Sequence, residues 1–119
     1  MRTLKVLVVD DDEMTREVLE TMLEGCEVSV ADDGESALKA AERDRPDVVL
    51  LDIRMPGMDG FEVCRQLKAW SDPPKVVMVT AKTATEDERK ARGAGADDYL
   101  RKPFSPLEIL RIVGAERST

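Results

Sequence analysis

The sequence predicts an α/β protein, a three-layer sandwich in which a five-stranded parallel sheet lies between two layers of helices. Short apolar runs alternate with amphipathic segments along the whole chain, which is the βα alternation of a parallel sheet. The runs at 4–9, 48–51 and 76–79 are rich in Val and Leu, as expected of strands that helices cover on both faces. These three runs should be central, and we take the strand order to be 2-1-3-4-5.

The predicted strands lie at 4–9, 28–31, 48–51, 76–79 and 99–100. Right-handed crossovers should join them through one helix each. Three of these helices carry apolar residues at helical spacing, namely Met14, Val18, Leu19, Met22 and Leu23, then Ala37, Leu38 and Ala41, then Phe61, Cys64 and Leu67. Each set should cover one face of the sheet.

The last two helices have different signals. Residues 86–94 contain no Leu, Ile, Val, Met or aromatic residue, so this helix buries little area at about 25 cal/mol per Å² and should be among the more mobile elements. Ser105, Pro106 and Glu108 form the capping box of the final helix. Residues 114–119 are small and polar, and we expect a frayed tail or the start of a linker.

The composition describes one folded domain that spans residues 1–119. The 119 residues are 42% hydrophobic and 36% charged, with only 3% aromatic residues, so the core should be aliphatic. A net charge of -7 argues against direct nucleic-acid binding. The sequence lacks both a membrane-spanning run of about 20 apolar residues and a signal peptide, so we expect a cytoplasmic protein and no membrane partner.

The residue types restrict the chemistry. The chain has no His, which excludes Ser-His and Cys-His catalytic pairs. Cys26 and Cys64 are the only cysteines, and we interpret both as reduced structural residues. Carboxylates, hydroxyls, Lys and a metal ion are what remain for any reaction.

Reactive side chains follow four of the predicted strands. They are Asp10, Asp11 and Asp12 after the first strand, Asp52 after the third, Thr80 after the fourth and Lys102 after the fifth. Ligands of open parallel sheets bind beyond these carboxyl ends. Two carboxylates about 5 Å apart repel by about 3 kcal/mol at an effective dielectric of about 20. A hard cation such as Mg²⁺, with Lys102 as a second positive charge, would balance them.

Four segments resemble the receiver domains of response regulators. They are 6–11 (VLVVDD), 48–60 (VVLLDIRMPGMDG), 77–81 (VMVTA) and 93–104 (GAGADDYLRKPF), which occur in the order and spacing of that family and cover essentially the whole chain. The resemblance implies a flavodoxin-like (βα)5 fold. It also implies a signalling switch that receives a phosphoryl group from a sensor histidine kinase or a histidine phosphotransfer protein.

The resemblance also assigns roles to the acidic residues. Asp52 would be the phosphoacceptor, and Asp10 and Asp11 would form the acidic pair. Asp11, Asp52 and the backbone carbonyl of Arg54 would ligate Mg²⁺, or Mn²⁺ in its place. Arg54 and Lys82, each two residues beyond a site residue, would influence how readily water reaches the acyl phosphate.

Three further residues complete the implied site. Thr80 would hydrogen-bond the phosphoryl group, and Lys102 would pair with it, aimed inward by a cis peptide bond to Pro103. Thr80 would move inward on phosphorylation, and Tyr99 would follow. Asp12 has no implied ligand role and is interpreted as a capping or surface acid.

The implied output surface consists of the helix at 86–94, the fifth strand and the last helix. It would act on a downstream effector or an output domain that the sequence does not identify, and it would allow a dimer. The only reactions implied are self-catalysed phosphoryl transfer and dephosphorylation, so the chain is not expected to be an enzyme in the ordinary sense.

Two alternatives remain open at this stage. A small phosphatase of the haloacid dehalogenase type would use Asp10 and Asp12, with Asp97 and Asp98 as its distal acidic pair. Met14 stands where that family has Thr or Val, however, and Asp52 would have no role. The second alternative is a receiver-like binding module that signals without phosphate.

Overall fold

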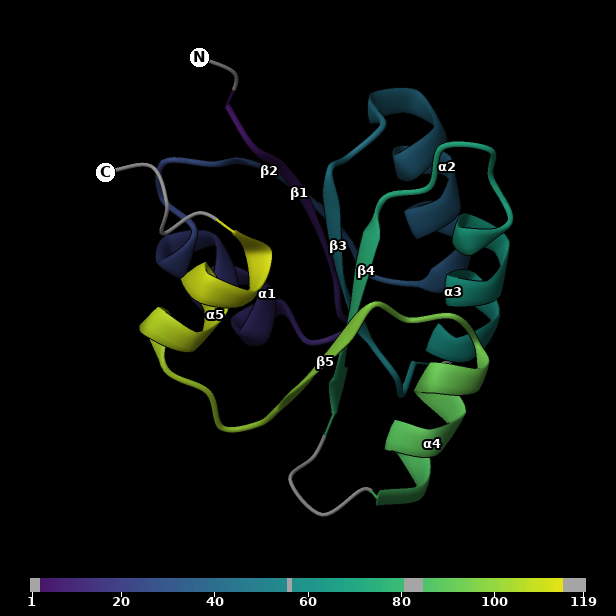
Figure 1. Ribbon diagram of the computed structural model, residues 1–119. Helices are drawn as coiled ribbons and strands as arrows, with labels where there is room; N and C mark the ends of the chain where they lie inside the picture. The colour runs from purple at the N-terminus through teal and green to yellow at the C-terminus, as the bar shows by residue number, and fades with distance from the viewer. Residues whose placement is uncertain (1–2, 56, 81–84, 115–119) are drawn as a thin grey trace.

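A five-stranded parallel sheet with helices on both faces forms the protein (Figure 1). The computed structural model describes residues 3–55, 57–80 and 85–114. The strands are β1 (Lys5–Val9), β2 (Glu27–Ala31), β3 (Val48–Asp52), β4 (Lys75–Thr80) and β5 (Asp98–Arg101). The helices are α1 (Glu13–Met22), α2 (Gly34–Asp44), α3 (Gly60–Lys68), α4 (Thr85–Gly93) and α5 (Pro106–Val113). The predicted alternation of strands and helices is confirmed.

The strand order is β2-β1-β3-β4-β5, and every pairing is parallel. The order is therefore the predicted one, and β1, β3 and β4 each have a strand on either side. Because all five strands run in the same direction, their carboxyl ends share one edge of the sheet, which is the lower edge in Figure 1. Residues that follow β1, β3, β4 and β5 are thereby brought together.

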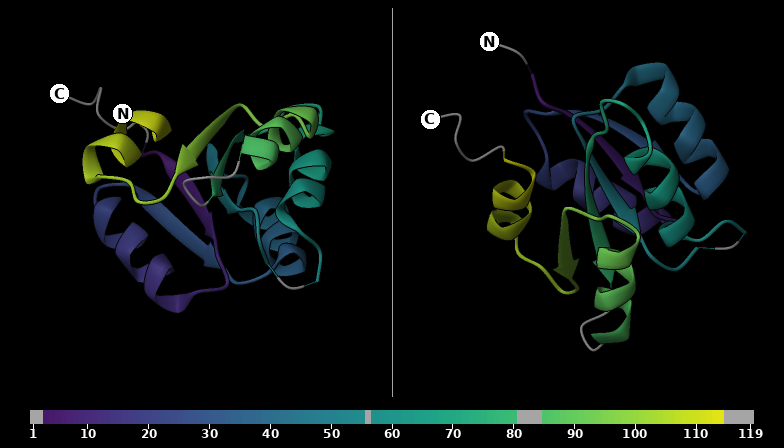
Figure 2. Two further views of the ribbon diagram at one scale, coloured as in Figure 1. Left: turned by 90° about the horizontal axis from the view of Figure 1, so that it is seen from below. Right: turned by 45° about the vertical axis from the view of Figure 1, so that its right-hand side comes forward.

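Two aliphatic cores lie on opposite faces of the sheet. The alternation of side chains along a strand sends Val6 and Val8 to the face covered by α1 and α5, and Leu7 and Val9 to the face covered by α2, α3 and α4. Figure 2 shows the two helical layers on either side of the strands. Since β3 is buried along its whole length, the strand that ends in Asp52 is held from both sides.

The prediction for the first helix is only partly right. Leu19 and Leu23 are buried, but Met14 is 71% exposed and Val18 is also exposed. Met14 and Val18 lie four residues apart and form one stripe, whereas Leu19 and Leu23 form a second stripe about 100° further round the helix. The second stripe faces the sheet. The matching prediction for α3 is confirmed, because Phe61, Cys64 and Leu67 are all buried.

The last two helices are built as predicted from their sequences. α4 buries Ala91, the buried Ala94 follows directly after it, and residues 86–94 contain no larger apolar side chain; the mobility of α4 stays a prediction. In α5 the Ser105 hydroxyl accepts from the Glu108 amide at 3.2 Å, and the Glu108 carboxylate accepts from the Ser105 amide at 2.9 Å. Gly114 ends α5 with a positive φ of 86°, and residues 115–119 lie outside the described part of the chain.

Cys26 and Cys64 are both free thiols, as predicted. Burial raises the pKa of the Cys64 thiol to about 11, so it remains protonated and donates to the Ala94 carbonyl oxygen. Among the described residues, no helix has the length and apolar character needed to cross a bilayer.

Candidate functional site

Three carboxylates meet at the shared edge of the sheet. Asp10 and Asp11 follow β1 and Asp52 ends β3, and these two strands are neighbours with Val9 opposite Leu51. One oxygen from each carboxylate can be chosen so that all three lie within 4.8 Å of one another. The predicted convergence is therefore confirmed, while the roles of the three residues stay predictions.

Asp10 is the structural centre of this cluster. It is 3% exposed, and its Oδ1 accepts from the Asp12 amide at 2.9 Å. Its backbone carbonyl accepts from Arg16 Nη1 at 2.7 Å, and its Oδ2 lies 3.6 Å from Lys102 Nζ. The predicted cis peptide bond between Lys102 and Pro103 is present. The 3.6 Å distance places the Lys102 ammonium at the acidic cluster, although the side chain is 38% exposed.

Asp52 has an unusual protonation equilibrium. Burial raises its pKa from an ordinary 3.8 to about 6, and the negative charges of Asp10 and Asp11 add to this rise, against the lowering effects of Lys102 and of the Arg54 amide. Its carboxylate is largely buried and lies beside two other acids, with the Lys102 ammonium as a nearby cation. The site thus favours an additional positive charge.

We expect this shift to appear in the pH dependence of stability. The folded protein holds the Asp52 proton more tightly than the unfolded chain does, so acid favours folding at this group. The contribution is fully present below pH 3.8 and is lost as the pH rises through about 6, and the full loss is at most about 3 kcal/mol. Urea unfolding of the wild type and of Asp52→Asn at several pH values measures the difference. Parallel curves for the two proteins would contradict the expectation.

Thr80 and Arg54 both turn toward α4. Thr80 is 3% exposed, and its hydroxyl donates to Asp87 Oδ2 at 3.4 Å. Arg54 donates from Nη2 to the same oxygen at 2.9 Å, and its backbone amide reaches Asp52 Oδ1 at 3.4 Å. Sequence reasoning missed Asp87, although its spacing of four residues before Ala91 placed it on the inner face of α4.

The remaining predicted residues lie as follows. Tyr99 lies on β5, is half-buried, and packs against the core that α2, α3 and α4 cover; the Arg101 guanidinium carbon lies 5.7 Å from the centre of its ring. Asp12 occupies the N-cap position of α1, where its side chain accepts from the Thr15 hydroxyl at 2.6 Å but makes no capping hydrogen bond to a backbone amide of the helix; it is exposed, so the surface-acid part of its interpretation is confirmed. Lys82 lies outside the described residues.

The loop after β3 brings α3 close to the phosphoacceptor candidate. Gly57 has a positive φ of 78°, and the neighbouring Pro56 lies outside the described residues. Asp59 caps α3 by accepting from the Glu62 amide at 3.0 Å. A Cβ on Gly60 would lie 2.5 Å from the backbone oxygen of Asp52. Only glycine allows α3 to begin this close to the end of β3.

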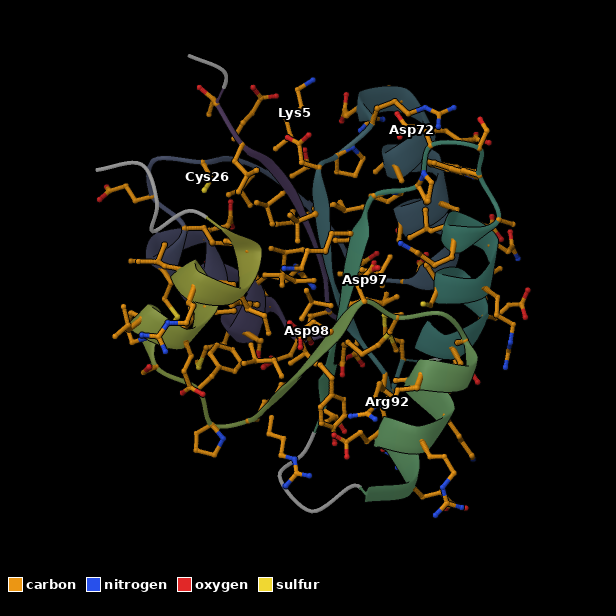
Figure 3. The ribbon with its side chains drawn as sticks, viewed as in Figure 1. Lys5, Cys26, Asp72, Arg92, Asp97 and Asp98 are labelled. Atoms are coloured by element: carbon orange, nitrogen blue, oxygen red, sulfur yellow. The ribbon has the colours of Figure 1, made fainter. Side chains whose placement is uncertain are left out.

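The acidic pair required by the phosphatase alternative is not assembled. The Asp97 carboxylate accepts from the Val76 amide at 2.8 Å and from Lys68 Nζ at 2.6 Å. Val76 is at the start of β4, so Asp97 lies near the amino end of the sheet, where the chain enters β5 (Figure 3). Asp97 therefore ties α3 to the β4–β5 pair, and the phosphatase alternative is not favoured.

A five-stranded parallel sheet in this order, covered by helices on both faces, is the fold of solved response regulators. A chemotaxis response regulator of Vibrio cholerae, CheY4, superposes with a TM-score of 0.87 at 34% identity and covers 95% of this chain and 98% of its own. A response regulator of Chloroflexus aurantiacus superposes with a TM-score of 0.90 at 34% identity, over 94% and 95% of the two chains.

The chain belongs to the response regulator receiver domain family, whose model matches residues 6–114. It is 49% identical over 113 residues to the DNA-binding response regulator MtrA of Mycobacterium tuberculosis, covering 93% of this chain and 49% of that protein. It is 43% identical over 114 residues to the response regulator MprA of Mycobacterium leprae, covering 94% and 50%. The chain thus spans about half the length of these relatives. It is a two-component receiver domain, as the resemblance implied.

Proposed function

We propose that Asp52 accepts a phosphoryl group from a sensor histidine kinase or a histidine phosphotransfer protein, and that the added charge switches the domain. The observation that carries the proposal is the setting of the Asp52 carboxylate. It lies at the tip of a central strand, is 9% exposed, and is grouped with two other carboxylates and the Lys102 ammonium. Membership of the receiver family supports this function.

In this proposal the Asp52 carboxylate is the nucleophile. One of its oxygens forms a bond to phosphorus while the bond from phosphorus to the donor nitrogen breaks, and the donor imidazole leaves with that electron pair. A pKa of about 6 leaves most Asp52 side chains ionised at neutral pH and makes them more basic than an ordinary Asp carboxylate. The group is therefore both available and reactive.

Asp11, Asp52 and the backbone carbonyl of Arg54 would hold Mg²⁺, or Mn²⁺ in its place, with Asp10 beside them. The residues fit such an ion, because carboxylate oxygens within 4.8 Å of one another are the hard ligands that it prefers. Burial is the main cause of the raised pKa of Asp52, and the charges of Asp10 and Asp11 raise it further, so a bound cation would stabilise the ionised carboxylate. When bound, the ion supplies positive charge to the phosphoryl oxygens.

Lys102 and Thr80 would serve the transferred group directly. Lys102 is held 3.6 Å from Asp10 Oδ2, and its ammonium would pair with a phosphoryl oxygen. The Thr80 hydroxyl would donate to another phosphoryl oxygen after leaving Asp87, its present partner. Tyr99, on the strand next to Thr80, would follow this movement and alter the face formed by α4, β5 and α5.

The conformational change would be transmitted to partners through a surface away from the phosphorylation site. We propose that residues 1–119 act as one cytoplasmic receiver domain whose α4–β5–α5 face meets an effector or an output domain, or a second copy in a dimer. The DNA-binding relatives favour a DNA-binding output that lies outside these residues, since the net charge of -7 disfavours contact with DNA by the domain itself. Beyond self-catalysed transfer and loss of the phosphoryl group, no enzymatic activity is proposed.

Treatment with acetyl phosphate and Mg²⁺, followed by borohydride trapping and peptide mass analysis, tests the proposal. The trapped product should lie at Asp52 and should depend on Mg²⁺. Product at Asp10 or Asp11 would overturn the assignment of Asp52. Steady hydrolysis of a phosphomonoester that requires Asp10 but not Asp52 would support the phosphatase alternative instead.

We expect Lys102→Met to slow phosphorylation by acetyl phosphate about a hundredfold, the usual cost of removing one preorganised positive group from a transition state. The rate of adduct formation, followed by intact mass, measures the effect. Lys39→Met is the matched control, since it removes the same charge from the exposed face of α2, where Lys39 pairs with Glu35. Equal rates for the Lys102 variant and the control would rule out this role.

A further inference from the structure

Asp87 is a buried acid that the proposed chemistry does not use. It is 6% exposed and lies on the inner face of α4 with Ala91. A carboxylate in such a position needs charged or hydrogen-bonding partners to offset the loss of water. The identity of those partners therefore shows what this acid contributes to holding α4 against the rest of the protein.

Among the described residues, two side chains donate to Asp87, and both come from the rim of the phosphoryl site. A single oxygen, Oδ2, accepts from Arg54 Nη2 at 2.9 Å and from the Thr80 hydroxyl at 3.4 Å. Arg54 lies two residues after Asp52, and Thr80 ends β4. Asp87 thus engages one side-chain donor that follows β3 and another that ends β4.

A phosphoryl group on Asp52 would compete with Asp87 for these donors. The hydroxyl of Thr80 has one hydrogen and can donate to one acceptor at a time. If it turns to a phosphoryl oxygen, Asp87 is left buried with fewer partners and next to about two new negative charges. The helix that carries Asp87 then gains by moving outward, where water can solvate the carboxylate.

The surroundings of α4 permit such a movement. The helix stands beside the carboxyl end of the sheet (Figure 1) and has only alanines as apolar residues on its inner face, so little buried area opposes its displacement. An open hollow of about 600 Å³ separates it from the loop after β3, lined by Arg54, Met55, Phe61, Glu86, Asp87 and Lys90. The contact between Arg54 and Asp87 spans this hollow.

We infer that Asp87 is a positioning residue that holds Thr80 and Arg54 away from the phosphoryl position. It thereby raises the free energy that phosphorylation must supply to change the conformation of the domain. The inference rests on the proposed function at Asp52. The Asp87 carboxylate and the phosphoryl group would then compete for the same donors, and α4 would move when Asp87 loses its hydrogen bonds to them.

Asp87→Asn tests the inference, because it removes the charge while preserving size and hydrogen-bonding capacity. Beryllofluoride with Mg²⁺, which stands in for a phosphoryl group on a carboxylate, is titrated and followed by NMR. The variant should bind it about tenfold more tightly, the equivalent of about 1.4 kcal/mol. In the protein without beryllofluoride, the α4 amides of the variant should exchange with solvent at least about threefold faster. A merely structural role would not tighten beryllofluoride binding.

Glu86→Gln is the matched control, since it removes one charge from the adjacent, exposed position on the rim of the same hollow. It should change neither measurement more than about twofold, because charges at an exposed surface interact weakly with their surroundings. If both variants changed beryllofluoride affinity and α4 exchange equally, the loss of one negative charge near the site would explain the result, and the inference would be overturned.

Arg54→Gln removes one partner of Asp87 by changing a side chain that is itself 76% exposed, so the substitution creates no cavity. It should also speed exchange in α4, and it decides the question if Asp87→Asn does not fold. Unchanged α4 exchange in this variant would overturn the inference even then. Failure of the wild type to bind beryllofluoride at Asp52 would instead count against the proposed function, whereas wild-type binding with no gain in Asp87→Asn would count against the role of Asp87 alone.

Discussion

Asp52→Asn is expected to reduce phosphoryl incorporation from acetyl phosphate to background. The amide nitrogen and oxygen cannot replace the carboxylate as nucleophile, and an acyl phosphate cannot form there. Asp10 and Asp11 should not replace Asp52 as phosphoacceptor. Asp10 is buried and engaged by Lys102 and the Asp12 amide. Asp11 lies in the segment after β1, whereas Asp52 is the last residue of β3. Intact mass after incubation with acetyl phosphate and Mg²⁺ measures the loss.

The same variant separates chemistry from folding. Since the Asp52 carboxylate is disfavoured in the folded state at neutral pH, the variant should be more stable than the wild type near pH 7 even though it is inactive. Asp12→Asn is the control: it changes a neighbouring acid at the α1 N-cap to another good capping residue and should keep nearly normal incorporation. Full labelling of Asp52→Asn would mean that the phosphoacceptor lies elsewhere.

Gly60→Ala is expected to destabilise the protein by about 3 kcal/mol or more, at the upper end of the cost of overpacking. The new Cβ would lie 2.5 Å from the backbone oxygen of Asp52 and 3.0 Å from the Cα of Ile53. Neither backbone atom can rotate away, so α3 must withdraw from β3. Because the Asp52 backbone is the other partner in the contact, phosphorylation should also slow. Chemical denaturation measures the first effect.

Gly93→Ala provides the comparison for this prediction. Gly93 is the last residue of α4, and a Cβ added to it would have no neighbouring atom within 4 Å among the described residues, so an added methyl meets open space. Alanine favours helix by as much as about 1 kcal/mol over glycine, and this variant should be neutral or slightly more stable. Comparable destabilisation by both substitutions would show that the close approach at Gly60 is not the cause.

The elements of the fold followed from local patterns. The runs that became β1, β3 and β4 are too apolar to be exposed, and they were correctly expected at the centre of the sheet. The capping box at Ser105 marked the start of α5. For α1 the pattern was insufficient: Met14 and Val18 share helical spacing with Leu19, but which of two adjacent stripes meets a sheet depends on how the helix is laid upon it.

Some residues of the candidate site could be predicted from the sequence, and one could not. Asp10, Asp11 and Asp52 could be brought together in advance, because parallel strands in a known order place their ends at one edge. Lys102 was expected there, and its 3.6 Å distance from Asp10 agrees. Asp87 was not expected, since an acid on a polar helix usually faces solvent. Only its position four residues before Ala91 distinguishes it from Glu86 and Glu88.

For this receiver domain, residue order alone dictated the alternating strands and helices and the set of reactive groups at the sheet edge, because hydrophobic periodicity and strand direction act over short stretches of chain. The choice of which helix faces are covered, the fit of Gly60 against Asp52, and the pairing of Asp87 with Arg54 and Thr80 required the assembled molecule. Those contacts join different strands, helices and loops, and their energies depend on distances of a few ångströms that no local pattern encodes.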